Sequence, residues 1–356
     1  MRIAVLGLGL IGGSVALAGV AAGAEVVAWD ISPEVVIPAR ERGIEVVTAE
    51  HPDELLAGAD LAFLAAPVGV LPELLATVLA AAPPGCVVTD VGSTKGAVVA
   101  AAGSDERFIG GHPLAGAETS GVAHARADLF RDATWYLTPT RHSDGQLYER
   151  LHRLIGSFGA RVAVIEPEQH DQAMALVSQL PHVLANVLVS QTAASLGEQG
   201  ERLPATGPSF RDLTRVAGAN SAIWGDIYLS NRELLAATLE GTIAQLQAVR
   251  AALIAADREL ITAWNERAAA DRRRLLGGEL SGGGVHELRV AVPNRPGVIA
   301  ELALELGRAG VNISDMALHP APDMASGLVT LWITGEQVAD RAQQILAAMD
   351  FAVTRG

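Results

Sequence analysis

The chain has 356 residues, 50% of them hydrophobic, and its 26 basic and 40 acidic residues give a net charge of −14. This length is too great for one small core and predicts two or three domains. The negative charge would repel a phosphate backbone, which excludes nucleic acid as an expected partner. The one basic cluster, Asp271-Arg272-Arg273-Arg274, ends a long predicted helix, where it is expected to offset the helix dipole and stay solvated.

Cysteine usage and hydropathy predict a cytoplasmic protein. Cys86 is the only cysteine, so no disulfide can form within the chain, and its apolar strand predicts a buried, inert thiol. Arg2 and the apolar run after it could be mistaken for a signal peptide, but the glycine spacing in the run and the following Asp30 argue against one. The Ala-rich region from Leu61 to Ala82 is broken by two prolines and a glutamate, so no membrane span is expected.

A glycine-rich turn follows the first predicted strand, at residues 2–6. Its sequence is Gly7-Leu8-Gly9-Leu10-Ile11-Gly12. In a dinucleotide-binding turn, Gly7 would allow the sharp bend, Gly9 the approach of a pyrophosphate, and Gly12 the close packing of the helix. The next strand ends in Asp30, at about the spacing where a carboxylate binds the ribose hydroxyls and repels a 2′-phosphate. The sequence therefore predicts an NAD site.

Apolar strands and helical segments then alternate through residues 59–65, 70–82 and 86–91, which is typical of a doubly wound parallel sheet. Ligands bind at the carboxyl ends of such strands, so Pro67 and the turn Ser93-Thr94-Lys95 are expected at the cofactor crevice. Ser93 to Lys95 fits a helix N-cap with its first turn equally well. Strands at 134–138 and 161–165, around a helix near 145–158, are expected to finish the sheet.

The stretch from Gly110 to Gly121 is the candidate for the chemistry. It follows a short predicted strand at 107–110 and combines one imidazole, one carboxylate and two hydroxyls with Gly and Pro. We expect a tight loop, not a regular element, at the same edge of the sheet. A plain polar connector is the alternative.

After residue 166 the hydrophobic pattern of the sequence becomes that of helices. The pattern from His170 to Leu196 is interrupted by Pro181, which is predicted to kink the helix and free a carbonyl. His170 and His182 lie on this segment, and each judged alone fits a satisfied core position. After a second helical block near Pro208, one periodic helix is predicted from about 227 to 276, long enough that its apolar stripe is expected to need a second subunit. Packing on the sheet domain is the alternative.

The last part reads as a small separate domain. Residues 277–284 are Gly-rich and predict a flexible linker, and residues 285–356 follow the order βαββα with a possible last strand at 351–353. We therefore predict a Rossmann-like nucleotide-binding domain (1–165), an all-α dimerisation domain (166–276), the linker (277–284) and a ferredoxin-like α+β domain (285–356). The sequence lacks zinc-spaced His or Cys pairs, calcium loops and phosphate-binding P-loops, so no metal site is expected.

Several separated motifs resemble the prephenate dehydrogenase family, over about residues 1 to 280. Members of this family oxidatively decarboxylate prephenate, or its transaminated form arogenate, on the way to tyrosine. Beside the glycine turn, the resemblance rests on Asp90-Val91-Gly92-Ser93-Thr94-Lys95, on Gly110 to Gly121, on Leu180-Pro181-His182 and on Phe210 to Arg215.

The resemblance implies a role for individual residues. His112 would contact the ring hydroxyl of the substrate as hydrogen-bond acceptor or base, assisted by Ser93, and Arg215 would hold a substrate carboxylate. His182 would line the same pocket. The ionic partners that shape access would be Glu118 and Asp212. An imidazole suits removal of a hydroxyl proton, and Arg matches a carboxylate bidentately, so the chemistry of the side chains agrees.

Two positions depart from the family pattern. Many relatives carry Thr where Ala117 stands, and His where Gln179 precedes the Leu-Pro-His motif. Both positions would take part in substrate binding, so the choice between prephenate and arogenate stays open.

The tail resembles an ACT domain, a regulatory fold that often binds amino acids between paired copies. This implies a homodimer whose activity is controlled by tyrosine, with a purely structural dimerising tail as the alternative. The candidate regulatory residues are Asn294, Arg295, Gly297, Val298, Asn312 and Ile313.

Two rival functions remain at this stage. A β-hydroxyacid dehydrogenase would need a catalytic lysine on the first helix after the sheet, where this chain offers His170 and Gln179 instead. A non-catalytic amino-acid sensor would have no use for His112, Ser93 and Arg215 together.

Overall fold

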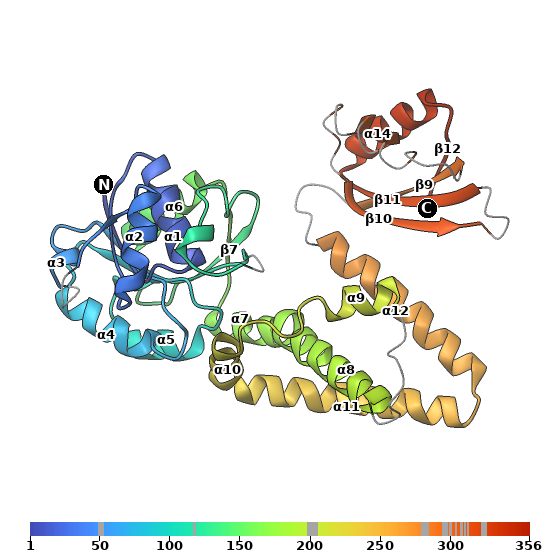
Figure 1. Ribbon diagram of the computed structural model, residues 1–356, viewed down its shortest axis with the longest axis horizontal. Coiled ribbons are helices and arrows are strands. Elements are labelled where there is room, and N and C mark those ends of the chain that lie inside the picture. The colour runs from blue at the N-terminus through green and yellow to red at the C-terminus, as the bar shows by residue number, and fades with distance from the viewer. Residues whose placement is uncertain are drawn as a thin grey trace. The chain divides into compact units, whose positions relative to one another are not determined.

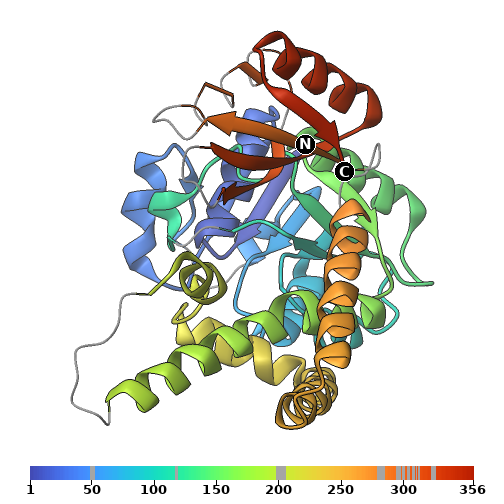
Figure 2. The same ribbon diagram turned by 90° about the vertical axis from the view of Figure 1, so that its right-hand side faces the viewer.

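The computed structural model describes residues 1–48, 53–116, 119–197, 206–278, 285–293, 298, 301–302, 305–306, 309, 311, 313–321 and 326–356. These fall into two compact units, Met1–Ala244 and Gln245–Gly356, and each is described by itself (Figures 1 and 2).

The first unit is built on a parallel sheet of five strands in the order β3-β2-β1-β4-β5. The chain order reverses between β1 and β4, which makes the carboxyl ends of these two strands the switch point where doubly wound sheets bind ligands. This confirms the predicted Rossmann-like domain. Its elements are β1 (Arg2–Leu6), α1 (Leu10–Ala21), β2 (Glu25–Trp29), a 3-10 turn (Pro33–Val35), α2 (Val36–Glu41), β3 (Glu45–Val46), α3 (Asp53–Leu56), β4 (Leu61–Leu64), α4 (Leu71–Ala81), β5 (Val87–Asp90) and α5 (Gly96–Ala102).

Alternate residues of the strands face two different cores, as the period of a strand requires. Ile3, Val5 and Phe63 belong to the core under α1 and α2, whereas Ala4 and Leu64 belong to the core under α3, α4 and α5. Figure 1 shows these two groups of helices on opposite faces of the sheet. Both faces are covered, which explains why the strands read as continuous apolar runs.

The next strands form a sheet of their own, which corrects the expectation that they finish the first one. β6 (Gly110–Pro113), β7 (Thr134–Thr138) and β8 (Arg161–Val164) pair in the order β6-β7-β8, with β6 antiparallel to β7. A single bridge, Val88 to Phe108, joins them to β5. A 3-10 turn (Val122–His124) and α6 (Gly145–Ser157) complete this part.

The helical part of the first unit begins with α7 (Pro167–Met174), followed by a π-helical turn (Ala175–Gln179) and α8 (Leu180–Gly197). Pro181 has no N–H and would clash with the carbonyl of residue 177, and the wider turn just before it accommodates this. The predicted interruption is therefore confirmed as a π-turn. α9 (Pro208–Thr214) packs against α8.

The expectation of one helix from about 227 to 276 is wrong. The chain forms α10 (Ser221–Ser230), α11 (Arg232–Ile254) and α12 (Arg258–Gly278). Ala256 takes a left-handed conformation, with φ 52°, and the Asp257 side chain accepts a 3.0 Å hydrogen bond from Leu260 N. A cap of this kind starts a new helix, so Asp257 divides a pattern that hydrophobic periodicity alone joins.

One segment, Pro167–Ser195, is long and apolar enough to cross a membrane by length and composition, and only 28% of its most apolar window is buried. Residues Leu176, Val177, Leu184 and Val187 of this segment are exposed.

The tail in the second unit is an antiparallel sheet of four strands in the order β10-β11-β9-β12. Val298, Leu302 and Leu306, spaced four apart, are buried against it, as are residues of α14. The strand order is that of a ferredoxin-like fold, as predicted. The elements are β9 (Val285–Pro293), β10 (Ile313–Pro320), β11 (Ser326–Thr334), α14 (Glu336–Ala348) and β12 (Ala352–Arg355).

Candidate active site

The glycine turn between β1 and α1 has the three different requirements that its spacing predicts. Gly7 has φ +104°, and a Cβ there would lie 2.3 Å from the Ala65 carbonyl oxygen. A Cβ on Gly12 would lie 2.0 Å from the Gly7 oxygen. At Gly9 no heavy atom lies within 4 Å of the Cβ position, so the fold itself does not need glycine there. The open space at Gly9 fits the approach of a cofactor phosphate.

Asp30, at the end of β2, faces this turn. Its Oδ2 accepts a 2.6 Å hydrogen bond from Leu8 N, and its Oδ1 accepts a 2.8 Å bond from Ser32 N. The carboxylate thus lies beside the turn, where it can reach ribose hydroxyls. Leu8 is buried, while Leu10 and Ile11 are half-buried at the start of α1.

His112 lies on strand β6, not in a loop. A Cβ on Gly110 would lie 2.3 Å from Thr138 Oγ1, and a Cβ on Gly111 would lie 2.6 Å from the Asp90 carbonyl oxygen. The two glycines before His112 therefore permit close packing of strands and are not turn residues, which corrects the expected tight loop. His112 is held rigidly as a result.

A buried ion pair joins the end of β5 to this strand. The Lys95 ammonium pairs with Asp90 and donates a 2.8 Å hydrogen bond to the Gly111 carbonyl oxygen, and neither charged side chain is exposed. Asp90 also accepts bonds from Gly92 N (2.8 Å) and Gly111 N (3.1 Å). Burial lowers the pKa of Lys95, and Asp90 opposes that shift.

His112 contacts the helical part of the unit through a second histidine. Its Nδ1 lies 2.8 Å from His170 Nε2, and His170 Nδ1 lies 2.8 Å from Asp171 Oδ1. Both residues belong to α7, and all three side chains are buried. Within the described part of the chain, Nε2 of His112 has no protein hydrogen-bond partner, which leaves this nitrogen for a ligand. Burial, then the neighbouring His170 and Lys95, lower the pKa of His112 well below 6.5, which favours the neutral ring.

Asp171 also decides between the two interpretations of residues 93 to 95. Its Oδ1 accepts a 2.8 Å bond from Lys95 N and its Oδ2 a 2.8 Å bond from Gly96 N, so it caps α5 from another part of the chain. The Ser93 side chain does not cap this helix. Ser93 is half-buried, and its hydroxyl makes no hydrogen bond to a described residue, so it is available to a ligand.

His182, near the start of α8, packs in an aromatic cluster. Its ring stacks on Trp224 with centroids 3.6 Å apart, and its Nδ1 hydrogen-bonds the Tyr228 hydroxyl. Burial lowers the pKa of His182. Gln179 is buried in the π-turn, where its Oε1 accepts a 2.9 Å bond from Asn231 Nδ2, which also donates to the Asp171 carbonyl oxygen. Gln179 Nε2 is buried and has no partner within the residues described.

The remaining predicted residues are not brought to His112 by these contacts. Asp212 and Arg215 are exposed at the end of α9. Pro67 follows β4, at the switch point beside the glycine turn. Ala117 and Glu118 lie outside the described residues, as do Asn294, Arg295, Gly297 and Asn312 of the tail. Of the predicted regulatory residues, the structure describes Val298, which is buried, and Ile313, which starts β10.

Several neighbours of His112 are brought together only by the fold. Asp171 and Asn231 were not predicted as site residues, Lys95 was predicted only as part of the turn after β5, and His170 was predicted only as a core histidine. A signal was present, because His170 and Asp171 are adjacent in the chain and together make an orienting pair for another imidazole.

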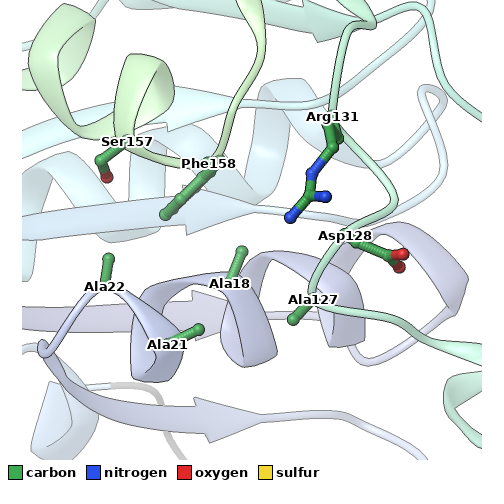
Figure 3. A pocket seen from close by; sticks show the side chains of 8 residues that line it. All are labelled: Ala18, Ala21, Ala22, Ala127, Asp128, Arg131, Ser157 and Phe158. Carbon is green, nitrogen blue, oxygen red and sulfur yellow. The ribbon is translucent and has the colours of Figure 1, made fainter. Parts of the chain in front are cut away.

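A pocket of about 180 Å³ lies elsewhere, at the end of α1 that is remote from the glycine turn. It is lined by Ala18, Ala21, Ala22, Ala127, Asp128, Arg131, Ser157 and Phe158. In Figure 3 the Phe158 ring and the Arg131 guanidinium point toward α1. Neither this lining nor any other group of described residues offers three His, Cys, Asp or Glu side chains arranged to hold a metal ion.

Comparison with known families matches two consecutive parts of the chain. The nucleotide-binding domain of prephenate dehydrogenase matches residues 15–164, and its dimerization domain matches residues 166–266.

Two curated relatives cover different shares of the chain. A prephenate dehydrogenase of Bacillus subtilis is 32% identical over 97% of this chain and 95% of its own length. A cyclohexadienyl dehydrogenase of Zymomonas mobilis is also 32% identical, over 73% of this chain and 91% of its own length.

Two solved structures resemble this one over about three quarters of the chain. The prephenate dehydrogenase of Aquifex aeolicus, in complex with hydroxyphenyl propionate and NAD+, has a TM-score of 0.70 and 28% identity, covering 77% of this chain and 98% of its own. The arogenate dehydrogenase of Synechocystis has a TM-score of 0.67 and 27% identity, covering 77% of this chain and all of its own (100%).

Proposed function

Because this chain belongs to the prephenate dehydrogenase family, we propose that His112 is the base in an NAD-dependent oxidative decarboxylation of prephenate to 4-hydroxyphenylpyruvate. The chain is an NAD-dependent dehydrogenase of that family. The observation that carries the role of His112 is its buried ring, whose Nε2 makes no hydrogen bond to a described residue, on a strand whose Gly111 is bonded to Asp90 at the carboxyl end of β5.

The chemistry requires a hydride to leave the ring carbon that bears the hydroxyl and a proton to leave the oxygen of that hydroxyl. NAD, when bound, supplies the hydride acceptor. His112 Nε2 accepts the hydroxyl proton, and the Ser93 hydroxyl, which makes no hydrogen bond to a residue that the structure describes, is available to hold the same oxygen. Loss of carbon dioxide then makes the ring aromatic and leaves a phenolate oxygen, which takes the proton back, so the overall step is strongly downhill.

Binding of a dianionic substrate needs a fixed cation. We assign this role to Arg215, on the family motif that contains it, and we assign Glu118 and Asp212 the role of ionic partners that shape access to the site. His182, held by its stack on Trp224, and the buried Gln179 amide supply polar groups for the rest of the substrate.

Arogenate is the alternative substrate, alone or together with prephenate. It carries an amino group where prephenate carries a keto oxygen, and Ala117 and Gln179 are the positions that depart from the family pattern. A solved relative is an arogenate dehydrogenase.

The test is NADH formation by the purified protein with prephenate and, separately, with arogenate. We expect turnover of prephenate, and a His112→Asn variant that is roughly a hundredfold to ten-thousandfold slower, the range for loss of a general base. If the protein turned over arogenate alone, arogenate and not prephenate would be its substrate. If it turned over neither compound, the proposed function would be overturned.

The exposed apolar residues of α8 support a homodimer, since they belong to the part matched by a dimerization domain. Contact with a second subunit would also explain why the segment Pro167–Ser195 is as long and apolar as a membrane span. We assign the protein to the cytoplasm on these grounds.

The tail is proposed to be an ACT domain that binds tyrosine. The Zymomonas mobilis relative aligns over most of its own length but only 73% of this chain, so the chemistry of the family does not require every part of this chain. The order of the four antiparallel strands supports the fold. Deleting the residues after Leu280 should abolish inhibition by tyrosine and leave turnover intact; inhibition that survives the deletion would move tyrosine to the active site.

A further inference from the structure

Three buried side chains stand in a row behind the candidate base. His112, His170 and Asp171 are joined by two contacts of 2.8 Å each, and the row crosses from strand β6 to helix α7. The inference drawn from it rests on the proposed function, in which His112 accepts the substrate proton.

The direction of each hydrogen bond in the row follows from Asp171. Its two oxygens already accept bonds from Lys95 N and Gly96 N, so the carboxylate acts as an acceptor toward His170 as well. His170 Nδ1 therefore carries a hydrogen, and in the neutral ring His170 Nε2 is bare. A bare Nε2 must accept from His112 Nδ1–H, which leaves the bare lone pair of His112 on Nε2.

The charges around His112 disfavour a proton that stays there. Burial and the Lys95 ammonium both lower the pKa of His112, and the Asp90 carboxylate is already paired with Lys95. Among the described residues, the other titratable groups in contact with the row are Asp171 on α7 and Tyr136 of β7, whose ring meets the edge of the His170 ring with centroids 5.7 Å apart. Among these neighbours, the carboxylate of Asp171 contacts His170, so a positive charge on the row is best stabilised at His170.

We propose that His170 is a positioning residue that also relays the proton, so that the positive charge formed on oxidation rests on the His170–Asp171 pair and not on His112. The O–H bond of the substrate breaks as the Nε2–H bond of His112 forms. The Nδ1–H bond of His112 breaks as the Nε2–H bond of His170 forms. His112 is neutral again, the imidazolium of His170 faces the Asp171 carboxylate, and the hydride has gone to NAD.

The variant that separates relay from simple support is His170→Gln. The glutamine carbonyl can still accept from His112 Nδ1–H, which keeps the tautomer, but an amide cannot take up a proton. We expect single-turnover NADH formation to slow by about 10- to 100-fold, with the KM for prephenate changed by less than about threefold. His152→Gln, at an exposed histidine of α6, is the matched control and should behave as the unaltered protein.

The decisive readout is the dependence of the rate on the deuterium content of the solvent. If two protons move in the same step, the rate of the unaltered protein should depend on the deuterium content along a curve. In His170→Gln only one proton moves, so the dependence should be a straight line. A purely structural role for His170 predicts straight lines for both proteins and would overturn the relay.

A measurement on the unaltered protein guards against a variant that fails to fold. NMR of the protein labelled with 15N-histidine should show His112 and His170 both neutral with the hydrogen on Nδ1, and a hydrogen on Nε2 of His112 would overturn the proposed direction. Absence of NADH with both substrates in the unaltered protein would instead reject the function, and the NMR result would still stand by itself.

Discussion

Replacing Gly9 by Ala should leave the folded protein intact and weaken its binding of NAD. No heavy atom lies within 4 Å of the Cβ position at Gly9, and the backbone there is extended, at φ −78° and ψ −160°, which alanine adopts freely. A surface change with no lost contact alters the free energy of unfolding by at most about 0.5 kcal/mol. The thermal midpoint without cofactor should therefore stay where it is.

The loss of affinity follows from what the methyl group displaces. It occupies the space through which a phosphate reaches the N–H groups of the turn. Losing one hydrogen bond to a charged group costs about 1.5–3 kcal/mol. At about 1.4 kcal/mol per factor of ten, NAD should bind roughly tenfold to a hundredfold more weakly.

Titration calorimetry with NAD and thermal unfolding without it measure the two effects. Gly12→Ala is the contrasting variant, because its Cβ would lie 2.0 Å from the Gly7 oxygen and 2.8 Å from the Ala65 Cβ, and it should lower the thermal midpoint. An unchanged dissociation constant for NAD in Gly9→Ala would refute the reasoning. So would a loss of stability as large as that of Gly12→Ala.

Three further experiments test other parts of the molecule. Arg215→Ala should raise the KM for prephenate roughly tenfold to a hundredfold, the value of a charged hydrogen bond, and an unchanged KM would place the carboxylate anchor elsewhere. Lys95→Met leaves the buried Asp90 carboxylate without its cation, which should cost about 3–5 kcal/mol in unfolding experiments, and the double variant with Asp90→Asn should recover most of it. Because Lys95 lowers the pKa of His112, kcat/KM of that double variant should begin to fall at a higher pH on acidification than kcat/KM of the unaltered protein. Burial raises the pKa of the Cys86 thiol to about 11, so a thiol reagent at about pH 8 should label none in the folded protein and one per chain after denaturation; labelling of the folded protein would contradict the burial.

The nucleotide-binding part was predictable because its signals are local. The glycine spacing from Gly7 to Gly12 and the carboxylate at Asp30 each follow from a conformation of a few neighbouring residues, and the structure has them as expected. The alternation of strands and helices likewise reflects short-range periodicity. Short-range sequence patterns were enough to predict this part, because its binding geometry depends on a few neighbouring residues.

The errors came from close packing and from distant contacts. Gly110 and Gly111 suggested a turn, but their small size lets strand β6 lie close to β7 and to the end of β5. The bonds that orient His112 join residues 58 positions apart, and those that cap α5 join residues 75 and 76 positions apart. No periodic pattern carries this information. His170 does occupy the satisfied core position predicted for it, and the same bonds that satisfy it are the ones that orient the base.

The capping of α5 by Asp171 has a consequence for how this enzyme can be divided. The two family domains meet between residues 164 and 166, yet the carboxylate that completes the nucleotide-binding domain lies beyond that point, as does the histidine that orients His112. A fragment that ends at residue 165 would keep its parallel sheet but expose two unbonded N–H groups and an imidazole with no fixed tautomer. A chimaera with a relative's helical domain would recover turnover only if that domain brought its own histidine and carboxylate to the same place. The boundary between the two family domains is therefore not a position at which one domain can be exchanged without loss of activity.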